Sequence, residues 1–344
     1  MAVEEDRWGR SPVQGLRVKD VLTKKKQVLA IAPEQTVEEA FELLSSKTFL
    51  SLPVKDDATG VFDLVDAALL LAAMFPDKAA LSDRTRVEKF TKTAVRDAVT
   101  ACVNYRVAEN LNLDTCGAID AEAPLSELVS MMWGGWRRVT TQVEGENYLI
   151  SQVDVAKFVT QNLSLLLAPS TLKAPISQVV KTDVLTAKAT DSALSVVSKL
   201  GKNGVWAVPL LDNAGTLVAA FSASDLRHLR ADNFKDLQLN AIEYLKTYAA
   251  RSRPFLDYRK SKNDDLNYLQ IGMPHTCQPH DAFDLVLFKL LALQVHRLFV
   301  VQDHKPVGVV SLSDIMKVFL FGDQPPACGD DENDDDDDVE NDDE

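Results

Sequence analysis

The 344-residue sequence has no long hydrophobic run and little glycine or proline, and each shortage excludes a class of protein. Its longest purely apolar run covers about nine residues, Ala67 to Phe75, whereas a membrane-spanning helix needs roughly 20. The first ten residues, MAVEEDRWGR, are charged and lack the apolar centre of a signal peptide. With 14 glycines, 14 prolines and 46% apolar residues, the composition excludes collagen and extended disorder. We expect a folded protein of one or two domains, without a membrane anchor.

Cysteine is also scarce. The chain has four cysteines with no CxxC pair among them, namely Cys102, Cys116, Cys277 and Cys328. We therefore expect reduced thiols in an intracellular protein, located in the cytoplasm, the nucleus or both. The segment HTCQPH, residues 275–280, contains possible metal ligands, but no second ligand pair accompanies it and strand alternation would separate its side chains. The sequence therefore predicts no metal site.

A surplus of basic residues is missing as well. The formal net charge is −14, and residues 330–344 alone carry 12 of the 51 acidic residues and no base. The remaining residues carry 39 acidic and 37 basic side chains and are nearly neutral. A nucleic-acid-binding protein needs a basic face, so we expect nucleic acid not to be the main ligand.

Four segments repeat one order of elements: a short apolar strand, an amphipathic helix, a strand, a turn, another strand, and a helix opened by an aspartate. The helices carry apolar residues at the i, i+3, i+4 spacing, as in residues 37–44. One aspartate opens each final helix: Asp66, Asp154, Asp225 and Asp314. Their separations of 88, 71 and 89 residues indicate two modules of two repeats each.

Polar, helix-prone stretches follow the first and the third repeat, which strengthens the internal duplication. They are expected to be helical linkers at 77–113 and 231–264. The first module is then 18–168, with repeats at about 18–76 and 114–168. The second module is 169–322, with repeats at about 172–230 and 265–322. Residues 1–17 form an N-terminal extension, and residues 323–344 form an acidic tail that we expect to be disordered.

A polar residue stands three positions before each of these aspartates: Asp63, Ser151, Ser222 and Ser311. At a strand-to-helix junction, the aspartate can accept hydrogen bonds from a vicinal diol such as a ribose, and the helix N-terminus offers N–H groups to a phosphate. The same pattern is also a capping box. Four copies in register favour a shared ligand site. The two interpretations are compatible, because a cap can also contact a ligand.

Two repeats place basic residues just before their central strand. These pairs are Arg137-Arg138 in the second repeat and His296-Arg297 in the fourth. Arginine suits phosphate because its planar guanidinium binds two oxygens at once, and histidine can donate beside it. The alternative is that these are solvated charges at the start of a strand. We favour phosphate binding in the fourth repeat and keep both interpretations for the second.

The stretch TCQPHDAFDLVLFKLLALQVHRLFVVQDHKPVGVVSLSDIMKVFL, about Thr276 to Leu320, resembles the cystathionine-beta-synthase (CBS) repeat. Within that group, it is similar to the gamma regulatory subunits of AMP-activated protein kinases, and so is NFKDLQLNAIEYL before it. The four-repeat layout covers about Val18 to Gly322, whereas the gamma-like resemblance lies in the second module. The resemblance implies an α/β fold of four CBS repeats, arranged as two Bateman modules in a pseudo-symmetric disk.

The resemblance further implies a non-catalytic regulatory subunit that binds AMP, ADP or ATP in clefts between paired repeats. Its partners would be the catalytic subunit of a kinase of the AMP-activated (sucrose-non-fermenting) type and a scaffold subunit of the beta type. In this family aspartates hold the ribose and basic side chains hold the phosphates. The positions that match are Asp314, Ser313, Ser311, His296, Arg297, Ser222, Asp225, Arg138 and Asp154.

The sequence departs from the family pattern, chiefly in the first module. Asp63 replaces the usual Ser or Thr, and Leu50 replaces a basic residue, so we expect the first site to be weak or empty. In the second repeat, Arg137 replaces a His and Thr140 replaces the usual Pro. In the third, Trp206 either stacks on a base or fills core, and we favour core.

Two other functions stay open. A CBS scaffold or a phosphatase-type or kinase regulator without nucleotide sensing would explain the departures at Asp63 and Leu50. A sensor of another adenosyl ligand, such as S-adenosylmethionine, would not need the arginine clusters. An enzyme is not expected, because the repeats and linkers occupy residues 18 to 322 and no spacing indicates a nucleophile and its base.

Overall fold

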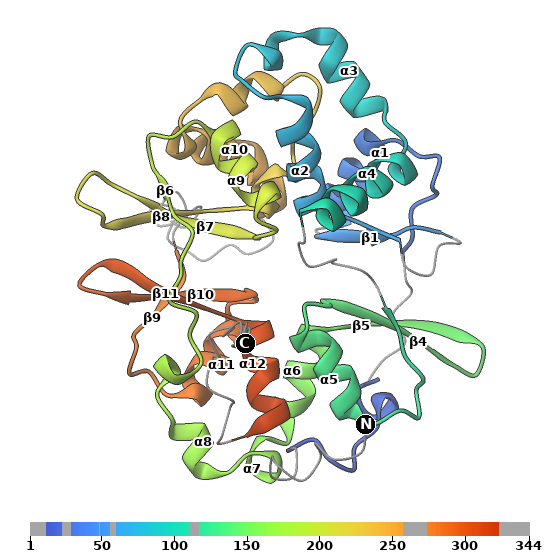
Figure 1. Cartoon of the computed structure of the whole chain (residues 1–344), viewed down its shortest axis with the longest axis vertical. Coiled ribbons are helices and arrows are strands. Elements are labelled where there is room, and N and C mark those ends of the chain that lie inside the picture. The colour runs from blue at the N-terminus through green and yellow to red at the C-terminus, as the bar shows by residue number, and fades with distance from the viewer. Residues whose placement is uncertain are drawn as a thin grey trace, which may run out of the picture.

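The computed structural model describes residues 12–22, 29–47, 49–55, 60–109, 117–256 and 274–322. The predicted acidic tail, most of the predicted N-terminal extension and residues 257–264 of the second predicted linker lie outside the described residues. Within them the fold is a flattened α/β disk of four repeats (Figure 1).

In the last three repeats, a small sheet pairs the central strand parallel with the first strand and antiparallel with the third. The first repeat contains α1 (Val37–Lys47), β1 (Ser51–Pro53), β2 (Val61–Asp63) and α2 (Leu64–Met74). The second contains β3 (Gly117–Ala118), α5 (Leu125–Trp133), β4 (Arg138–Val143), β5 (Glu146–Ser151) and α6 (Gln152–Gln161). In the first repeat, a parallel bridge between Ile31 and Val54 replaces the first strand.

The second module repeats this order. The third repeat contains β6 (Ala187–Lys188), α9 (Ala193–Lys202), β7 (Ala207–Leu211), β8 (Leu217–Ser222) and the 3₁₀ helix η4 (Ala223–Leu226). The fourth contains β9 (Thr276–Cys277), α11 (Phe283–Ala292), β10 (Arg297–Gln302), β11 (Lys305–Ser311) and α12 (Leu312–Phe321).

Further helices lie before the first repeat's α1 and between the repeats. The α-helices are α3 (Arg84–Lys92), α4 (Val95–Ala108), α7 (Leu163–Leu166), α8 (Pro169–Lys173) and α10 (Ala241–Leu256). The 3₁₀ helices are η1 (Val18–Val21), η2 (Ala80–Ser82), η3 (Ile176–Gln178) and η5 (Phe234–Gln238).

The apolar run of the first repeat folds into α2, which is buried on all sides. Nine of its 11 residues are buried, because α2 packs against α9 on one side and α4 on another. Gly201 of α9 makes the closest of these approaches possible, since a Cβ atom there would lie 2.4 Å from the backbone nitrogen of Leu69. An apolar helix of this length therefore forms the centre of a core rather than a membrane span.

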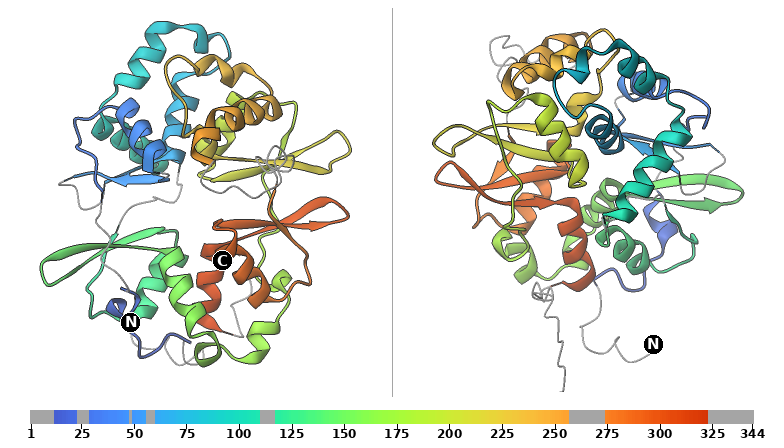
Figure 2. Two further views of the ribbon diagram at one scale, coloured as in Figure 1. Left: turned by 180° about the vertical axis from the view of Figure 1, so that it is seen from behind. Right: turned by 45° about the horizontal axis from the view of Figure 1, so that its top comes forward.

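Two hydrophobic cores cross the module boundary. One core joins the first and third repeats through α2 and α9, and the other joins the second and fourth through α5, α6 and α12. Figures 1 and 2 show the result: one half of the disk holds repeats one and three and the other holds repeats two and four, with the sheets lining the boundary and the helices outside. We call these the 1/3 half and the 2/4 half.

The third repeat differs from expectation, because its final helix is the short η4 rather than a full α-helix. Two tyrosines of α10 form hydrogen bonds with backbone carbonyls of this turn. The hydroxyl of Tyr244 donates to the carbonyl of Asp225, and that of Tyr248 donates to the carbonyl of Ser224. Asn233 then accepts the backbone N–H of Arg230 and closes a turn. These side-chain bonds compete with the continuation of the helix.

Candidate functional site

One register position of every repeat lies at the same cavity. The residues at this position are Leu50, Arg137, Trp206 and His296, and all four line the cavity. In each repeat its backbone carbonyl accepts the N–H of the first residue of the final helix, as in Gln152 to Arg137 at 3.3 Å and Leu312 to His296 at 3.0 Å. The shared bond holds the start of the central strand against the start of the helix. The internal repetition therefore brings four equivalent side chains together.

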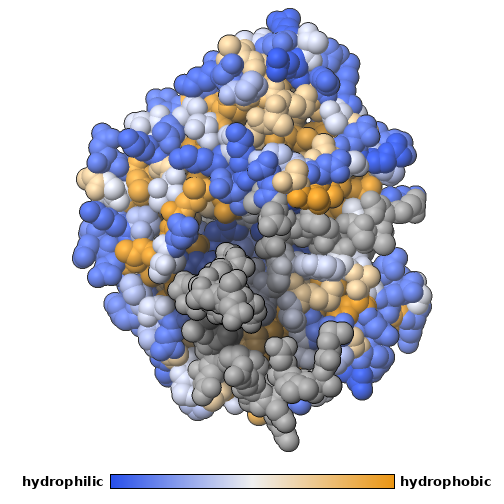
Figure 3. Space-filling model, in the orientation of Figure 1, coloured by the Kyte–Doolittle hydropathy of each residue, from blue (hydrophilic) through white to orange (hydrophobic). Residues whose placement is uncertain are grey.

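The cavity is small and basic. Its volume is about 80 Å³, and its other lining residues are Arg138, Ser151, Gln152, Val153, Arg297, Ser311, Leu312 and Ser313. None of the described residues that line it carries a carboxylate. Three guanidiniums, one imidazole and several hydroxyls therefore surround a space whose described lining has no acidic side chain. On the face seen in Figure 3, the surface is hollowed near the middle of the disk and hydrophilic side chains gather around the hollow.

Burial and mutual repulsion change the acid–base properties of this cluster. Burial and, to a smaller extent, the neighbouring charges of Arg297, Arg138 and Arg137 together lower the pKa of His296 to about 4. Burial also lowers the pKa of Arg297 to about 9, with a contribution from Arg137 that Asp314 opposes. His296 is therefore neutral near pH 7 while Arg297 keeps its charge. A bound anion would relieve the repulsion and raise both pKa values.

The four quartets form capping boxes, so that interpretation is confirmed. In each, the aspartate accepts the N–H of the polar residue three positions earlier, at 3.2 Å in Asp66, 3.0 Å in Asp154, 2.7 Å in Asp225 and 2.7 Å in Asp314. The Oγ atoms of Ser151 and Ser311 also donate to their aspartates, each at 2.6 Å. Capping leaves the outer carboxylate oxygens to other partners, and these partners differ between repeats.

In the first repeat, a buried arginine forms an ion pair with the capping aspartate. Arg106 of α4 lies 2.7 Å from Asp66, and both side chains are about 5% exposed or less. In the fourth repeat, Lys181 lies 3.6 Å from Asp314, and the lysine side chain is 68% exposed. In the third, burial raises the pKa of Asp225 to about 7, although the Ser222 N–H and Arg227 oppose the shift. Of these three carboxylates, Asp314 has the most accessible cationic partner.

The cavity gathers five of the nine predicted site residues: Arg138, His296, Arg297, Ser311 and Ser313. Asp154, Asp225, Asp314 and Ser222 do not line it, although Asp314 bonds to Ser311. Ser313 accepts a 2.9 Å hydrogen bond from Gln152, which also donates to the carbonyl of Met132 at 3.0 Å. This bond links the second repeat to the fourth.

Sequence reasoning left seven lining residues out of the predicted site, and four of them carry a polar group that a ligand could contact: Arg137, Ser151, Gln152 and Trp206. Arg137 and Ser151 could have been found, because each stands at a register position that is equivalent to a predicted residue of the fourth repeat. Trp206 lies at that position too, but an apolar side chain there is also typical of core. It belongs to the core of the 1/3 half and lies beneath the Arg137 guanidinium, 4.7 Å from ring centre to Cζ.

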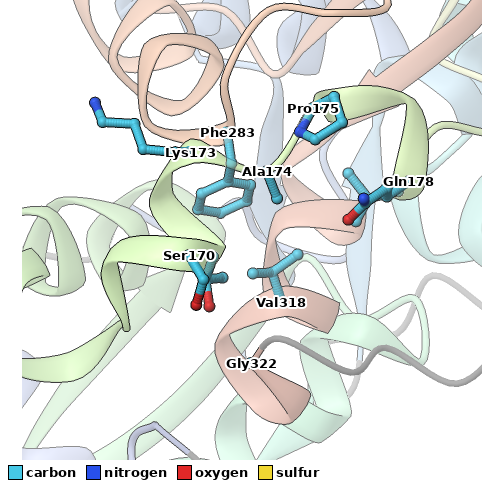
Figure 4. Close-up of a pocket in the computed structure, with 10 residues that line it drawn as sticks. Ser170, Lys173, Ala174, Pro175, Gln178, Phe283, Val318 and Gly322 are labelled. Atoms are coloured by element: carbon cyan, nitrogen blue, oxygen red, sulfur yellow. The ribbon is translucent and has the colours of Figure 1, made fainter.

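A larger cavity of about 320 Å³ lies at the edge of the 2/4 half (Figure 4). Phe283 and Val318 face it from α11 and α12, and Ser170 and Ala174 border it from the segment that joins the modules. Lys173 also borders it, but its ammonium donates to Asp284 at 2.6 Å. No cluster of charges converges here among the described residues, so we take the smaller central cavity as the candidate site.

The described ranges hold neither a metal-binding cluster nor a helix that could span a membrane. No group of three or more histidine, cysteine or acidic side chains there is arranged to hold a metal ion. Nor does any described helix combine the length and the apolar character that crossing a bilayer requires.

Comparison with known proteins identifies the repeat. Residues 18–72 and 273–320 match the family model of the CBS domain. The chain is 24% identical to the gamma subunit of the 5′-AMP-activated protein kinase of Saccharomyces cerevisiae, across 88% of this chain and 89% of that protein. The chain therefore contains CBS domains, one matched in each module. It is also 23% identical to protein sds23/moc1 of Schizosaccharomyces pombe, across 88% of this chain and 79% of that protein.

A solved structure shows the same fold. A protein of Methanocaldococcus jannaschii, described as a candidate archaeal homolog of g-AMPK, matches with a TM-score of 0.61 and 16% identity, covering 88% of this chain and all of that one. The predicted α/β fold of four CBS repeats in two Bateman modules is therefore confirmed. The chain resembles proteins named as gamma subunits of the 5′-AMP-activated protein kinase.

Proposed function

We propose that this CBS-domain protein is a non-catalytic regulatory subunit that binds adenine nucleotides and reports the balance of AMP, ADP and ATP to a protein kinase of the AMP-activated type. Its partners would be a kinase catalytic subunit and a beta-type scaffold subunit, in the cytoplasm, the nucleus or both. Resemblance over most of the chain to a protein named as a kinase gamma subunit supports the partner class.

The observation that carries the proposal is the convergence of Arg137, Arg138, His296 and Arg297 on a cavity whose described lining has no carboxylate. Repulsion between these cations contributes to the lowered pKa values of His296 and Arg297. An oxyanion would relieve that repulsion, and guanidinium groups bind phosphate oxygens in a planar, two-bond geometry. The cavity therefore suits the phosphate end of a nucleotide.

The cavity volume limits what part of a nucleotide it can hold. At about 80 Å³ it is well below the roughly 300–1,000 Å³ of a typical small-molecule site. We propose that a phosphate enters it while the nucleoside lies outside, where the Asp314 carboxylate and the start of α12 are close. AMP and ATP would then differ in how many phosphates the basic cluster must accommodate. Only such a difference in binding can shift a regulatory subunit between states.

Isothermal titration of the full-length chain with AMP, ATP and S-adenosylmethionine tests the proposal. We expect AMP or ATP to bind, and the Arg138→Gln and Arg297→Gln variants to lose roughly ten- to a hundredfold in affinity, because each removes charge-assisted hydrogen bonds to phosphate. The matched control is Arg96→Gln, which removes a guanidinium that is 61% exposed and 3.7 Å from Glu34. It should bind like the unmodified chain.

Circular dichroism of every variant separates loss of binding from loss of folding. Absence of heat with either nucleotide, for a folded chain, would refute nucleotide sensing and favour the scaffold function. If S-adenosylmethionine binds and neither arginine substitution changes its affinity, the result would favour a sensor of that ligand. If Arg138→Gln and the control bind nucleotide with equal affinity, the basic cluster does not take part in nucleotide binding.

A further inference from the structure

Trp206 is the largest of the four equivalent side chains at the central cavity. It is 6% exposed, and its indole Nε1 is buried without a hydrogen-bond partner among the described residues. Buried polar groups in native proteins are nearly always hydrogen-bonded, so a buried, unpartnered N–H on a residue that lines a cavity points to an acceptor from outside the chain. No carboxylate among the described lining residues can serve as that acceptor.

The side chains around Trp206 restrict the chemistry of the acceptor. Indole N–H is a donor only, and the guanidinium of Arg137, stacked over the ring, also has donors only. Arg138 and Arg297 add two more donor-only groups to the same lining. An apolar ligand would offer the indole no acceptor, and a cationic ligand would be repelled by the guanidiniums. The surroundings therefore select an oxygen-rich anion.

The bulk of Trp206 also limits the length of that anion. The indole comes from the third repeat and Arg137 from the second, so their contact at 4.7 Å joins two different modules, and both side chains line the cavity. Together they leave about 80 Å³, a volume comparable to a few water molecules of about 30 Å³ each. A single phosphate group is of that order, whereas a triphosphate is several times longer.

We propose that Trp206 is a specificity-determining residue of the central cavity, which donates its indole N–H to one terminal phosphate and fills the space that a polyphosphate would need. The inference rests on the proposed nucleotide binding and deepens it: the preferred ligand class is a nucleoside monophosphate. In the first repeat the equivalent residue is Leu50, which offers no donor, so the indole is the one contribution of the 1/3 half to phosphate recognition among these four positions.

The test uses two substitutions that separate the N–H from the bulk of the ring. Trp206→Phe keeps an aromatic ring for Arg137 and removes the donor. Trp206→Leu keeps apolar packing and opens the cavity. Isothermal titration of the full-length variants with AMP, ATP and inorganic phosphate gives the affinities. We expect the unmodified chain to favour AMP over ATP at least tenfold. Trp206→Phe should lose roughly tenfold in AMP and in phosphate affinity, and Trp206→Leu should bring the AMP-to-ATP ratio close to one.

Tryptophan fluorescence provides a second readout. AMP should change the emission of the unmodified chain and of the control Trp133→Phe, whose ring is 40% exposed and packs on Phe321 away from the cavity. The change should be lost in Trp206→Phe. AMP affinity and AMP-to-ATP ratio unaltered in both Trp206 variants, with Arg138→Gln still defective, would overturn the role of Trp206 and leave the proposed function intact. No binding of any of the three ligands to the unmodified chain would overturn both.

Discussion

The two halves of the disk are built from the same repeat, yet they treat charge in opposite ways. In the 1/3 half the carboxylates are neutralised from within: Arg106 pairs with the buried Asp66, and burial raises the pKa of Asp225 to about 7. In the 2/4 half, paired cations meet at the central cavity and contribute to lowering the pKa of His296 to about 4. One half balances its charges internally, whereas the other concentrates positive charge at a cavity.

Part of the difference arises from the side chains at one register position rather than from the backbone. The same backbone hydrogen bond holds Leu50, Arg137, Trp206 and His296 at the start of their central strands. The same capping box holds the aspartate of every repeat. A duplicated backbone can therefore keep four equivalent junctions while side-chain changes at one position alter the charge of each junction.

The largest effect should come from breaking the internal pair of the 1/3 half. Arg106→Leu leaves Asp66 as a buried charge without its guanidinium, which should lower the free energy of unfolding by about 3–5 kcal/mol. The double variant Asp66→Asn, Arg106→Leu removes the charge as well and should recover much of the loss. Urea denaturation measures both, with the exposed-pair variant Arg96→Gln as the control. Equal stability of Arg106→Leu and the control would show that this half does not depend on its internal cation.

The second effect concerns pH, where the halves should respond with opposite signs. His296 takes up a proton at about 4 when folded and at about 6.5 when unfolded, so protons favour unfolding in that interval and stability falls as pH drops through it. Asp225 takes up a proton at about 7 when folded and at about 3.8 when unfolded, so its contribution to stability is lost as pH rises through that interval.

Denaturation curves between pH 4 and pH 8 test this contrast. His296→Gln should flatten the acid side of the stability profile by roughly 1–3 kcal/mol, and Asp225→Asn should flatten the loss of stability toward neutral pH. If the stability of His296→Gln and that of the unmodified chain change with pH in parallel, the pKa of His296 is not lowered in the folded chain. If Asp225→Asn loses stability toward neutral pH more steeply than the unmodified chain does, the Asp225 carboxyl does not have a raised pKa in the folded chain.

Periodicity made the repeats predictable from the sequence. The four repeats, the quartets and the basic pairs are local patterns, and the structure confirms the fold they predict. The shortening of η4 was not visible, because it depends on Tyr244 and Tyr248 from a helix about 20 residues further along the chain. Local propensity alone favours a helix there.

The candidate site was predictable only in part, for the same reason. Arg138, His296 and Arg297 reach the cavity because they flank a strand start that the repeat makes visible. The ion pair between Asp66 and Arg106 depends on how α4 packs beside α2, because Arg106 stands 40 positions after Asp66 in the chain. The contact of Trp206 with Arg137 depends on two modules meeting, and no pattern within one repeat encodes it.

The smallest effect should come from the corresponding internal pair of the 2/4 half. Lys181 is fixed to β11 by backbone bonds with Val309, but its ammonium is largely exposed and lies 3.6 Å from Asp314. Lys181→Ala should therefore cost less than about 1 kcal/mol in urea denaturation, and high salt should abolish the cost. A loss of stability as large as that of Arg106→Leu would mean that Asp314 depends on its lysine as Asp66 depends on its arginine. A small loss of stability means that the ion pair with Lys181 is weak, so that a ligand can replace the lysine at the Asp314 carboxylate.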